Sequence, residues 1–225
     1  MEVFCLNAFL KAAILTVIVL MLTLVLVFQV DGMRQNDLQT SINNLSFELE
    51  NNRLISKYAT IMAPDSDKCE FLEYTGAMQE KRAFSLAYTI QEYEKANIVG
   101  AEYENLKKTY FLSLADLYIT FFENKKTCPN IKNIPVAFFY SQSDCPACNV
   151  QGSVLSSVSS KCPNVSVFAF PSDTNYPFLN ILSDRYKVSQ VPIIVINDTK
   201  VLPGLSSESQ LISALKDAGA TCSNN

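Results

Sequence analysis

Cysteine is the residue type that gives this sequence its chemistry. Seven of the 225 residues are cysteines and none is a histidine. The lack of histidine excludes hydrolases that use an imidazole base and zinc sites with histidine ligands. Two of the cysteines stand three residues apart in the segment Cys145-Pro146-Ala147-Cys148. Two sulfurs at this spacing can pass between a dithiol and a disulfide by exchange with the cysteines of another protein.

The position of this pair predicts which sulfur reacts first. It follows a short apolar stretch that is typical of a buried strand, and it precedes a stretch with helical periodicity. Cys145 is therefore expected at the start of a helix, where free N–H groups and the helix dipole favour a thiolate, and Pro146 suits the first helical turn. We expect Cys145 to attack a client sulfur and Cys148 to resolve the mixed disulfide.

Three other interpretations of the pair compete with this one. A zinc site would need two further cysteine ligands, and the sequence has no second C-x-x-C segment, so we expect neither a metal nor another cofactor. A purely structural disulfide and an inactive copy of a redox fold are the other two. A cysteine pair at a strand-to-helix turn is more typical of a redox motif, so disulfide exchange is favoured.

The elements that must position this pair lie in residues 135–221. They are, in order, a strand at 135–141, a helix that begins near Cys145, a strand at 165–170, a helix at 176–186, strands at 192–196 and 200–202, and a helix at 208–218. Asn197 and Asp198 suit a tight hairpin turn between the last two strands. This order predicts an α/β layer fold with a mixed sheet and flanking helices.

The segment from about Pro135 to Ala220 resembles a domain of the thioredoxin superfamily. Its C-x-x-C segment follows the first strand, and residues 186–192, which lead into 193–196, are similar to the cis-proline region of that family. Residues 203–205, with the sequence Pro-Gly-Leu, are similar to the turn before the family's last helix. The resemblance covers this segment only and does not extend to the residues before it.

The resemblance implies roles for residues outside the cysteine pair. It implies that the Val191–Pro192 peptide bond is cis and that Pro192 packs beside Cys145. The backbone of Val191 would then pair with an incoming substrate strand, and Pro146 would be a second substrate contact. A cis bond before proline is a minority form that persists only where tertiary structure holds it.

Two positions depart from the pattern of cytosolic thioredoxins. Phe139 stands where that family carries a buried acidic residue, and Asp144 stands where a tryptophan normally precedes the motif. A carboxylate beside Cys145 should oppose formation of the thiolate. The direction of electron flow therefore stays open.

The N-terminal segment is unusually apolar. Residues 12–28 contain no charged side chain, and residues 12–30 would form a helix of roughly 28 Å, close to the thickness of a bilayer core. The segment lacks both the cleavage site of a signal peptide and the polar face of a soluble helix, so a retained single-pass anchor is expected after a short flank, 1–11. Lys11 favours a cytoplasmic N-terminus with the later domain outside, and the reverse topology is the alternative.

Between the anchor and the first strand, residues 31–128 show helical periodicity, followed by a linker at 129–134. Stripes of apolar residues predict two or three helices packed as a hairpin, the first of them carried by Leu38, Ile42, Leu45 and Leu49. A set of aromatic residues is expected in the core of this region rather than along a ligand groove. These residues are Tyr103, Tyr110, Phe111, Tyr118, Phe121 and Phe122.

Four further cysteines bear on the cellular compartment. In the fold implied by the resemblance, Cys162 and Cys222 lie just beyond the ends of two helices on one sheet face, and Cys69 and Cys128 flank the helical region. Two such bridges would be typical of an oxidising space. Spacing alone does not fix the connectivity, and free buried thiols are the alternative.

These patterns lead to one functional hypothesis and one alternative. A net charge of −4 gives no reason to expect nucleic acid as a partner. The hypothesis is a membrane-anchored thiol-disulfide oxidoreductase, with protein thiols and disulfides as substrates and an unidentified redox partner. The alternative is a membrane-tethered binding module that uses the same fold as a scaffold without catalysis. The last residues, 222–225, are expected to form a short tail.

Overall fold

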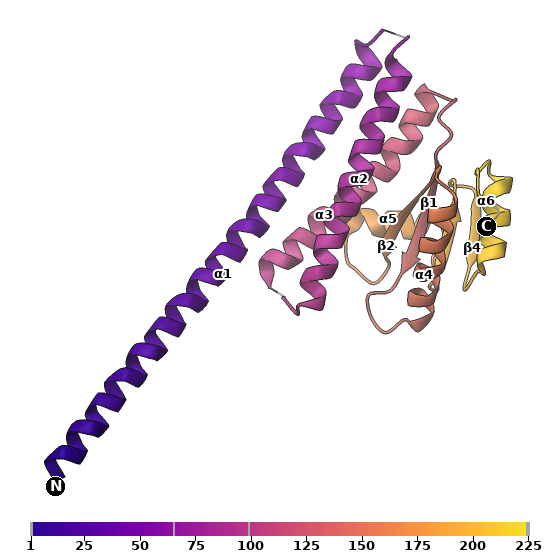
Figure 1. The fold of residues 1–225 in the computed structure, drawn as a ribbon. Coiled ribbons are helices and arrows are strands. Elements are labelled where there is room, and N and C mark those ends of the chain that lie inside the picture. Colours follow the sequence, from indigo (N-terminus) through magenta and orange to yellow (C-terminus); the bar gives the residue numbers. More distant parts are fainter. Residues whose placement is uncertain (1, 65, 99, 224–225) are drawn as a thin grey trace.

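The chain forms three long helices followed by a four-stranded mixed sheet with helices on both faces (Figure 1). The computed structural model describes residues 2–64, 66–98 and 100–223. The long helices are α1 (Glu2–Ile61), α2 (Lys68–Lys95) and α3 (Ala101–Thr127). The later elements are β1 (Ile134–Tyr140), α4 (Pro146–Lys161), β2 (Val165–Pro171), α5 (Pro177–Arg185), β3 (Ile193–Ile196), β4 (Lys200–Pro203) and α6 (Glu208–Asp217). The predicted element order and the mixed α/β class are confirmed.

The sheet has the strand order β2-β1-β3-β4, which places β2 and β4 at its two edges. β1 pairs in parallel with β2, because α4 crosses between them, and β1 pairs antiparallel with β3. β3 and β4 form a hairpin whose turn residues, Asn197 and Asp198, both have positive φ angles, of 50° and 62°. Asn and Asp tolerate this conformation better than other side chains do, which explains why they suit the turn.

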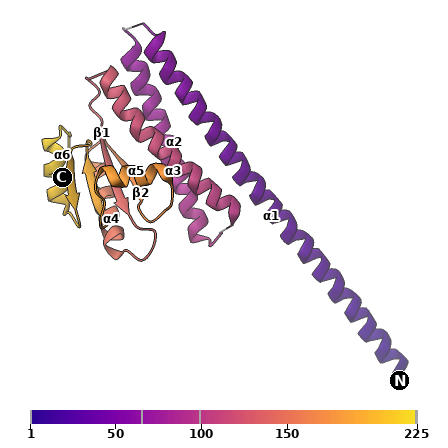
Figure 2. The same ribbon diagram turned by 180° about the vertical axis from the view of Figure 1, so that it is seen from behind.

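Helices cover both faces of the sheet, so its central strands are apolar throughout. α4 and α6 pack on one face, over Val136, Phe138 and Ile194. α5 and α3 pack on the other face, over Phe139 and Phe168. Figure 2 shows α5 in front of the strands in the view from behind.

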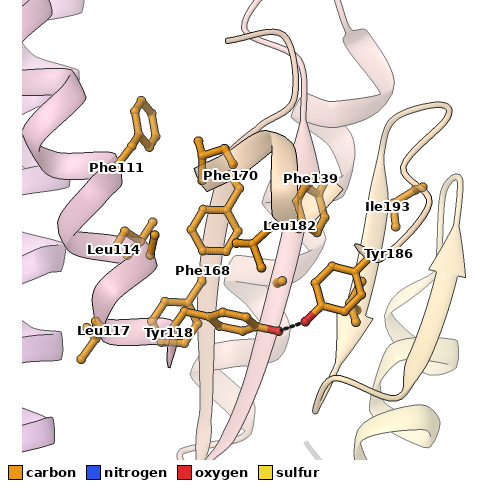
Figure 3. Close-up of a cluster of buried hydrophobic side chains, with 14 of the residues drawn as sticks. Phe111, Leu114, Leu117, Tyr118, Phe139, Phe168, Phe170, Leu182, Tyr186 and Ile193 are labelled. Atoms are coloured by element: carbon orange, nitrogen blue, oxygen red, sulfur yellow. Dashed lines mark hydrogen bonds between the residues drawn. The ribbon is translucent and has the colours of Figure 1, made fainter. Parts of the chain in front are cut away.

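α3 contributes a large part of the core on its face of the sheet. Figure 3 shows Phe111, Leu114 and Tyr118 projecting from α3 toward Phe168 and Phe170 of β2. The ring centre of Tyr118 lies 5.3 Å from that of Phe168 and 5.6 Å from that of Phe170, in edge-to-face geometry. α3 and the sheet therefore share one hydrophobic core. The division into domains at 129–134 stays a prediction.

The predicted aromatic core is confirmed for most of its members. Tyr103, Phe111, Tyr118 and Phe121 are buried, and Tyr110 and Phe122 are half-buried against the same clusters. The side chains of the predicted stripe at Leu38, Ile42, Leu45 and Leu49 lie outside the described residues.

A chain of polar side chains links α3 to the β3–β4 turn. The Tyr118 and Tyr186 hydroxyls are 2.9 Å apart, and the Tyr186 hydroxyl donates to Asp198 over 2.6 Å (Figure 3). Arg185 binds the same carboxylate through two nitrogens. Burial, and then the neighbouring hydroxyl, raises the pKa of Tyr118, so its phenol stays protonated at neutral pH. These hydrogen bonds give partners to polar atoms that would otherwise be buried without any.

α1 contains the apolar N-terminal segment and continues beyond it without a break. Residues Phe9–Met33 are long and apolar enough to cross a membrane, and their side chains are exposed. This range contains the predicted anchor at 12–30. From Met33 the helix runs roughly 40 Å further to Ile61 at its rise of 1.5 Å per residue, and in this part it packs against α3 and α2. Arg53 of α1 and Asp116 of α3 form an ion pair at 3.2 Å.

Candidate redox site

The cysteine pair lies where the chain passes from β1 into α4. Cys145 and Cys148 form a disulfide with their Cα atoms 5.2 Å apart. Cys145 is the N-cap residue of α4, and its sulfur accepts the Cys148 N–H over 3.2 Å. Pro146 occupies the first turn, where its missing N–H costs no hydrogen bond. The predicted placement of the pair at a strand-to-helix turn is confirmed.

The two sulfurs differ in exposure. Cys148 is only 4% exposed and belongs to the core cluster under α4 and α6, whereas Cys145 is half-buried at the edge of that cluster. Pro146 is exposed beside it. A thiol from outside the protein can therefore approach Cys145 more readily than Cys148.

Asp173 holds the loop that leads into Cys145, a role that the sequence analysis did not foresee. Its carboxylate accepts the Ser141 and Ser143 hydroxyls over 2.6 and 2.7 Å, and the backbone N–H groups of Gln142 and Ser143 over 3.0 Å each. Burial alone would raise the pKa of Asp173, but the hydrogen bonds from the two serine hydroxyls and the two N–H groups outweigh it and hold the pKa below its ordinary range. The parallel register, which ends at Tyr140 and Pro171, brings the two loops side by side.

Replacing Asp173 with asparagine is expected to change how stability depends on pH. The folded-state pKa of Asp173 is lowered, so its stabilising contribution is complete above the unfolded value of about 3.9 and is lost as the pH falls through the lower folded value. In D173N that loss is absent, and the stability at neutral pH falls by about 1 kcal/mol after allowance for solvent screening. Thermal unfolding from pH 7 to pH 2 measures both effects.

The matched control for D173N is Asp184→Asn, which changes an exposed carboxylate on α5. Its unfolding curve should keep the acid dependence of the wild type. Parallel curves for D173N and the wild type would show that Asp173 does not hold the loop through its charge.

The Val191–Pro192 peptide bond is cis, as the resemblance implied. Pro192 is buried, and its C=O accepts the Gly204 N–H over 2.8 Å. Val191 packs half-buried against the same cluster as Cys145, and within the described part of the chain its backbone N–H and C=O have no hydrogen-bond partner. The direct contact of Pro192 with Cys145 and the pairing of Val191 with a substrate stay predictions.

Gln151 is a second residue that the sequence analysis missed. It is fully buried in α4, where its side-chain amide accepts the Ser206 N–H over 2.7 Å and donates to the Ser206 C=O over 3.3 Å. These two bonds fix α4 against the segment that leads into α6. A glutamine in a helical pattern gives no signal of such a role, because most glutamines at those positions face solvent.

Four of the five other cysteines form two bridges. Cys69 pairs with Cys128 and Cys162 pairs with Cys222, which are the pairings that the sequence analysis considered. The first bridge joins the start of α2 to the end of α3. The second joins the end of α4 to the segment after α6, where the Ser223 N–H also donates to the Lys161 C=O over 2.9 Å.

Comparisons with known proteins do not assign the chain to a family. No protein-family model and no curated protein matches it. Among the solved structures that are similar to it, one described as the structure of a malarial protein is 19% identical, with a TM-score of 0.31. The match covers 38% of this chain and 96% of that one. A likeness at this level identifies no activity.

Proposed function

We propose that this protein is a membrane-anchored thiol-disulfide oxidoreductase with a thioredoxin-like domain, in which Cys145 is the nucleophile and Cys148 the resolving residue. The observation that supports it best is the disulfide at the start of α4, whose outer sulfur accepts the N–H of Cys148. This N–H and the positive end of the helix stabilise negative charge on Cys145. Cys145 is therefore both a good attacking group and a good leaving group.

The exchange runs through a mixed disulfide in either direction. When the pair is oxidised, a client thiolate attacks the Cys145 sulfur and Cys148 leaves as a thiolate; a second client thiolate then displaces Cys145, and the client keeps a disulfide. When the pair is reduced, Cys145 attacks a client disulfide, and Cys148 attacks the Cys145 sulfur to release the client as a dithiol. Each cycle transfers two electrons, which an external redox partner must remove or supply.

Residues around the pair are suited to hold the client. The backbone groups of Val191 have no hydrogen-bond partner among the described residues, and beside the buried Pro192 they can pair with an extended client segment. Pro146 presents an exposed apolar ring next to Cys145. We propose Cys145, Cys148 and Pro192 as the catalytic centre and Val191 and Pro146 as substrate contacts.

The anchor and the bridges support a location at the membrane surface, outside the cytoplasm. Phe9–Met33 can cross the bilayer once, and the later part of α1 packs against α2 and against α3, which itself packs on the sheet. The Cys69–Cys128 and Cys162–Cys222 bridges are typical of an oxidising compartment. We propose a cytoplasmic N-terminus, so that the redox domain meets clients on the other side.

A trapping experiment tests the proposed roles of the two sulfurs. In the Cys148→Ser variant, Cys145 can still attack a client disulfide but nothing resolves the product, so mixed disulfides are expected to accumulate on non-reducing gels of membranes. The Cys145→Ser variant is expected to trap far less, because Cys148 is buried. Equal trapping by both variants would contradict the assigned roles. If neither variant traps a mixed disulfide, the result would favour the binding-module alternative.

A further inference from the structure

The outer edge of β2 has open hydrogen-bonding groups. β2 is an edge strand, and its pairing with β1 is parallel. Two hydrogen bonds at the ends of this pair show which residues of β2 bond to β1: Ile134 N–H donates to Asn164 C=O, and Ser172 N–H donates to Tyr140 C=O. The backbone groups of the even-numbered residues of β2 therefore bond to β1, and those of the odd-numbered residues point outward.

Val167 and Ala169 are the outward residues in the middle of this edge. Within the described part of the chain, their backbone N–H and C=O groups have no hydrogen-bond partner. An open row of this kind is a template for another extended segment. Both side chains are half-buried on the α4 face of the sheet, beside Phe138 and Tyr140 of β1.

This edge opens into a groove between α2 and α4. The groove has a volume of about 620 Å³, within the range of ligand-binding sites. Its floor includes Phe138, Val167 and Ala169, and its two walls include Phe84 of α2 and Gly152 of α4. Cys148 also lines it, so the groove is continuous with the redox pair.

The shape and charge of the groove select its occupant. Residues of α2 and of α4 line the groove along this edge, so a narrow occupant fits it better than the edge of a second sheet flanked by its own helices. A single extended segment is narrow enough, and about seven residues would cover the seven residues of β2, because both strands rise about 3.3 Å per residue. Of the described residues that line the groove, only Glu94 is charged, which favours an apolar segment with neutral or basic side chains over an acidic one.

We infer that this groove binds an extended, apolar segment of a partner polypeptide, which adds to the sheet as a strand alongside β2. Main-chain hydrogen bonds to Val167 and Ala169 would provide affinity, and the apolar floor would select the alternate side chains. The identification of the partner as a redox client rests on the proposed function, because it follows from the continuity with Cys148. The binding itself does not depend on any redox step.

A peptide-binding experiment on the full chain in detergent micelles tests this inference. The probe is a fluorescein-labelled, cysteine-free peptide of about ten residues, with alternating Val and Thr and a Lys at each end. Fluorescence polarisation is expected to rise to saturation with the wild type. The same peptide with alternate backbone nitrogens methylated is expected not to bind, because it cannot form the ladder. No saturable binding of the unmethylated peptide would overturn the inference.

Two variants locate the site. Ala169→Pro removes an outward N–H that does not bond to β1, and proline is tolerated at such edge positions, so the variant is expected to fold. Because the peptide loses one main-chain hydrogen bond and meets the proline ring, its affinity is expected to fall at least tenfold. Val201→Pro, at the outward position of the opposite edge strand β4, is the matched control and should bind as the wild type does. Equal affinity of A169P and the wild type would contradict the assignment.

Gly152→Phe gives an independent test if A169P does not fold. A Cβ at Gly152 would meet only the Phe138 ring, at 4.0 Å, so the larger side chain enters the groove without strain in α4. This variant is expected to lose peptide binding, and unchanged binding by folded G152F would overturn the inference. Cys145→Ser is expected to bind the peptide normally, so a failure of exchange and a failure of strand binding can be told apart.

Discussion

Replacing Cys145 with serine is expected to reduce disulfide exchange to the uncatalysed rate, a loss of roughly three orders of magnitude or more. A serine oxygen cannot form a disulfide, so neither direction of exchange has its first intermediate. Cys148 cannot take over the attack, because it is buried on the face of α4 that packs against the sheet. Insulin reduction by dithiothreitol with catalytic amounts of the full chain, followed by turbidity, measures the rate.

The control for Cys145→Ser removes a different bridge. The Cys162→Ala, Cys222→Ala double variant opens a loop with a sequence separation of 60 and is expected to lose about 4 kcal/mol of stability. While it remains folded, its exchange rate should match the wild type. A Cys145→Ser variant with the wild-type rate would refute catalysis by this pair. A folded double variant with no exchange would assign the chemistry to Cys162 and Cys222.

The centre of the candidate site could be predicted from sequence because its signals are local. Two cysteines and a proline between a strand and a helix fix the N-cap geometry of Cys145 without reference to the rest of the chain. Asp173 could not be found this way, because it binds a loop 30 residues earlier in the sequence, which only the pairing of β1 with β2 brings close to it. A useful signal would have been that parallel strands end at the same edge, which brings Ser141 and Asp173 together.

The order of the elements could also be predicted from local sequence patterns, but the packing of the helical region could not. The spacing of seven residues places Leu114 and Phe121 on one face of a helix, but such a spacing does not show what that face contacts. The change in composition near Pro129 suggested a boundary, yet the side chains of α3 pack directly on β2. The apolar face of a helix can pack equally well against another helix or against a sheet, so only the tertiary structure shows which of the two it contacts.

A chain reduced to residues 129–225 is expected to be unfolded, because this deletion removes α3, which covers one face of the sheet together with α5. The lost side chains include Phe111, Leu114, Leu117, Tyr118 and Phe121. Each buried side chain of this size contributes about 1.5–3 kcal/mol, so together they approach the whole net stability of a domain, about 5–15 kcal/mol. Circular dichroism and the dispersion of amide signals in NMR spectra measure the outcome.

A chain that begins at residue 34 is the matched control, since it lacks the apolar segment Phe9–Met33 but retains the parts of α1 that pack on α2 and α3. It is expected to fold and to melt cooperatively. Phe168→Ala in this shorter chain should lower its stability by about 3–5 kcal/mol, because the Phe168 ring makes edge-to-face contacts with Tyr118 and Phe121 of α3. If residues 129–225 alone gave a cooperative transition with native disulfides, the sheet would be an independent domain and α3 only an accessory to it.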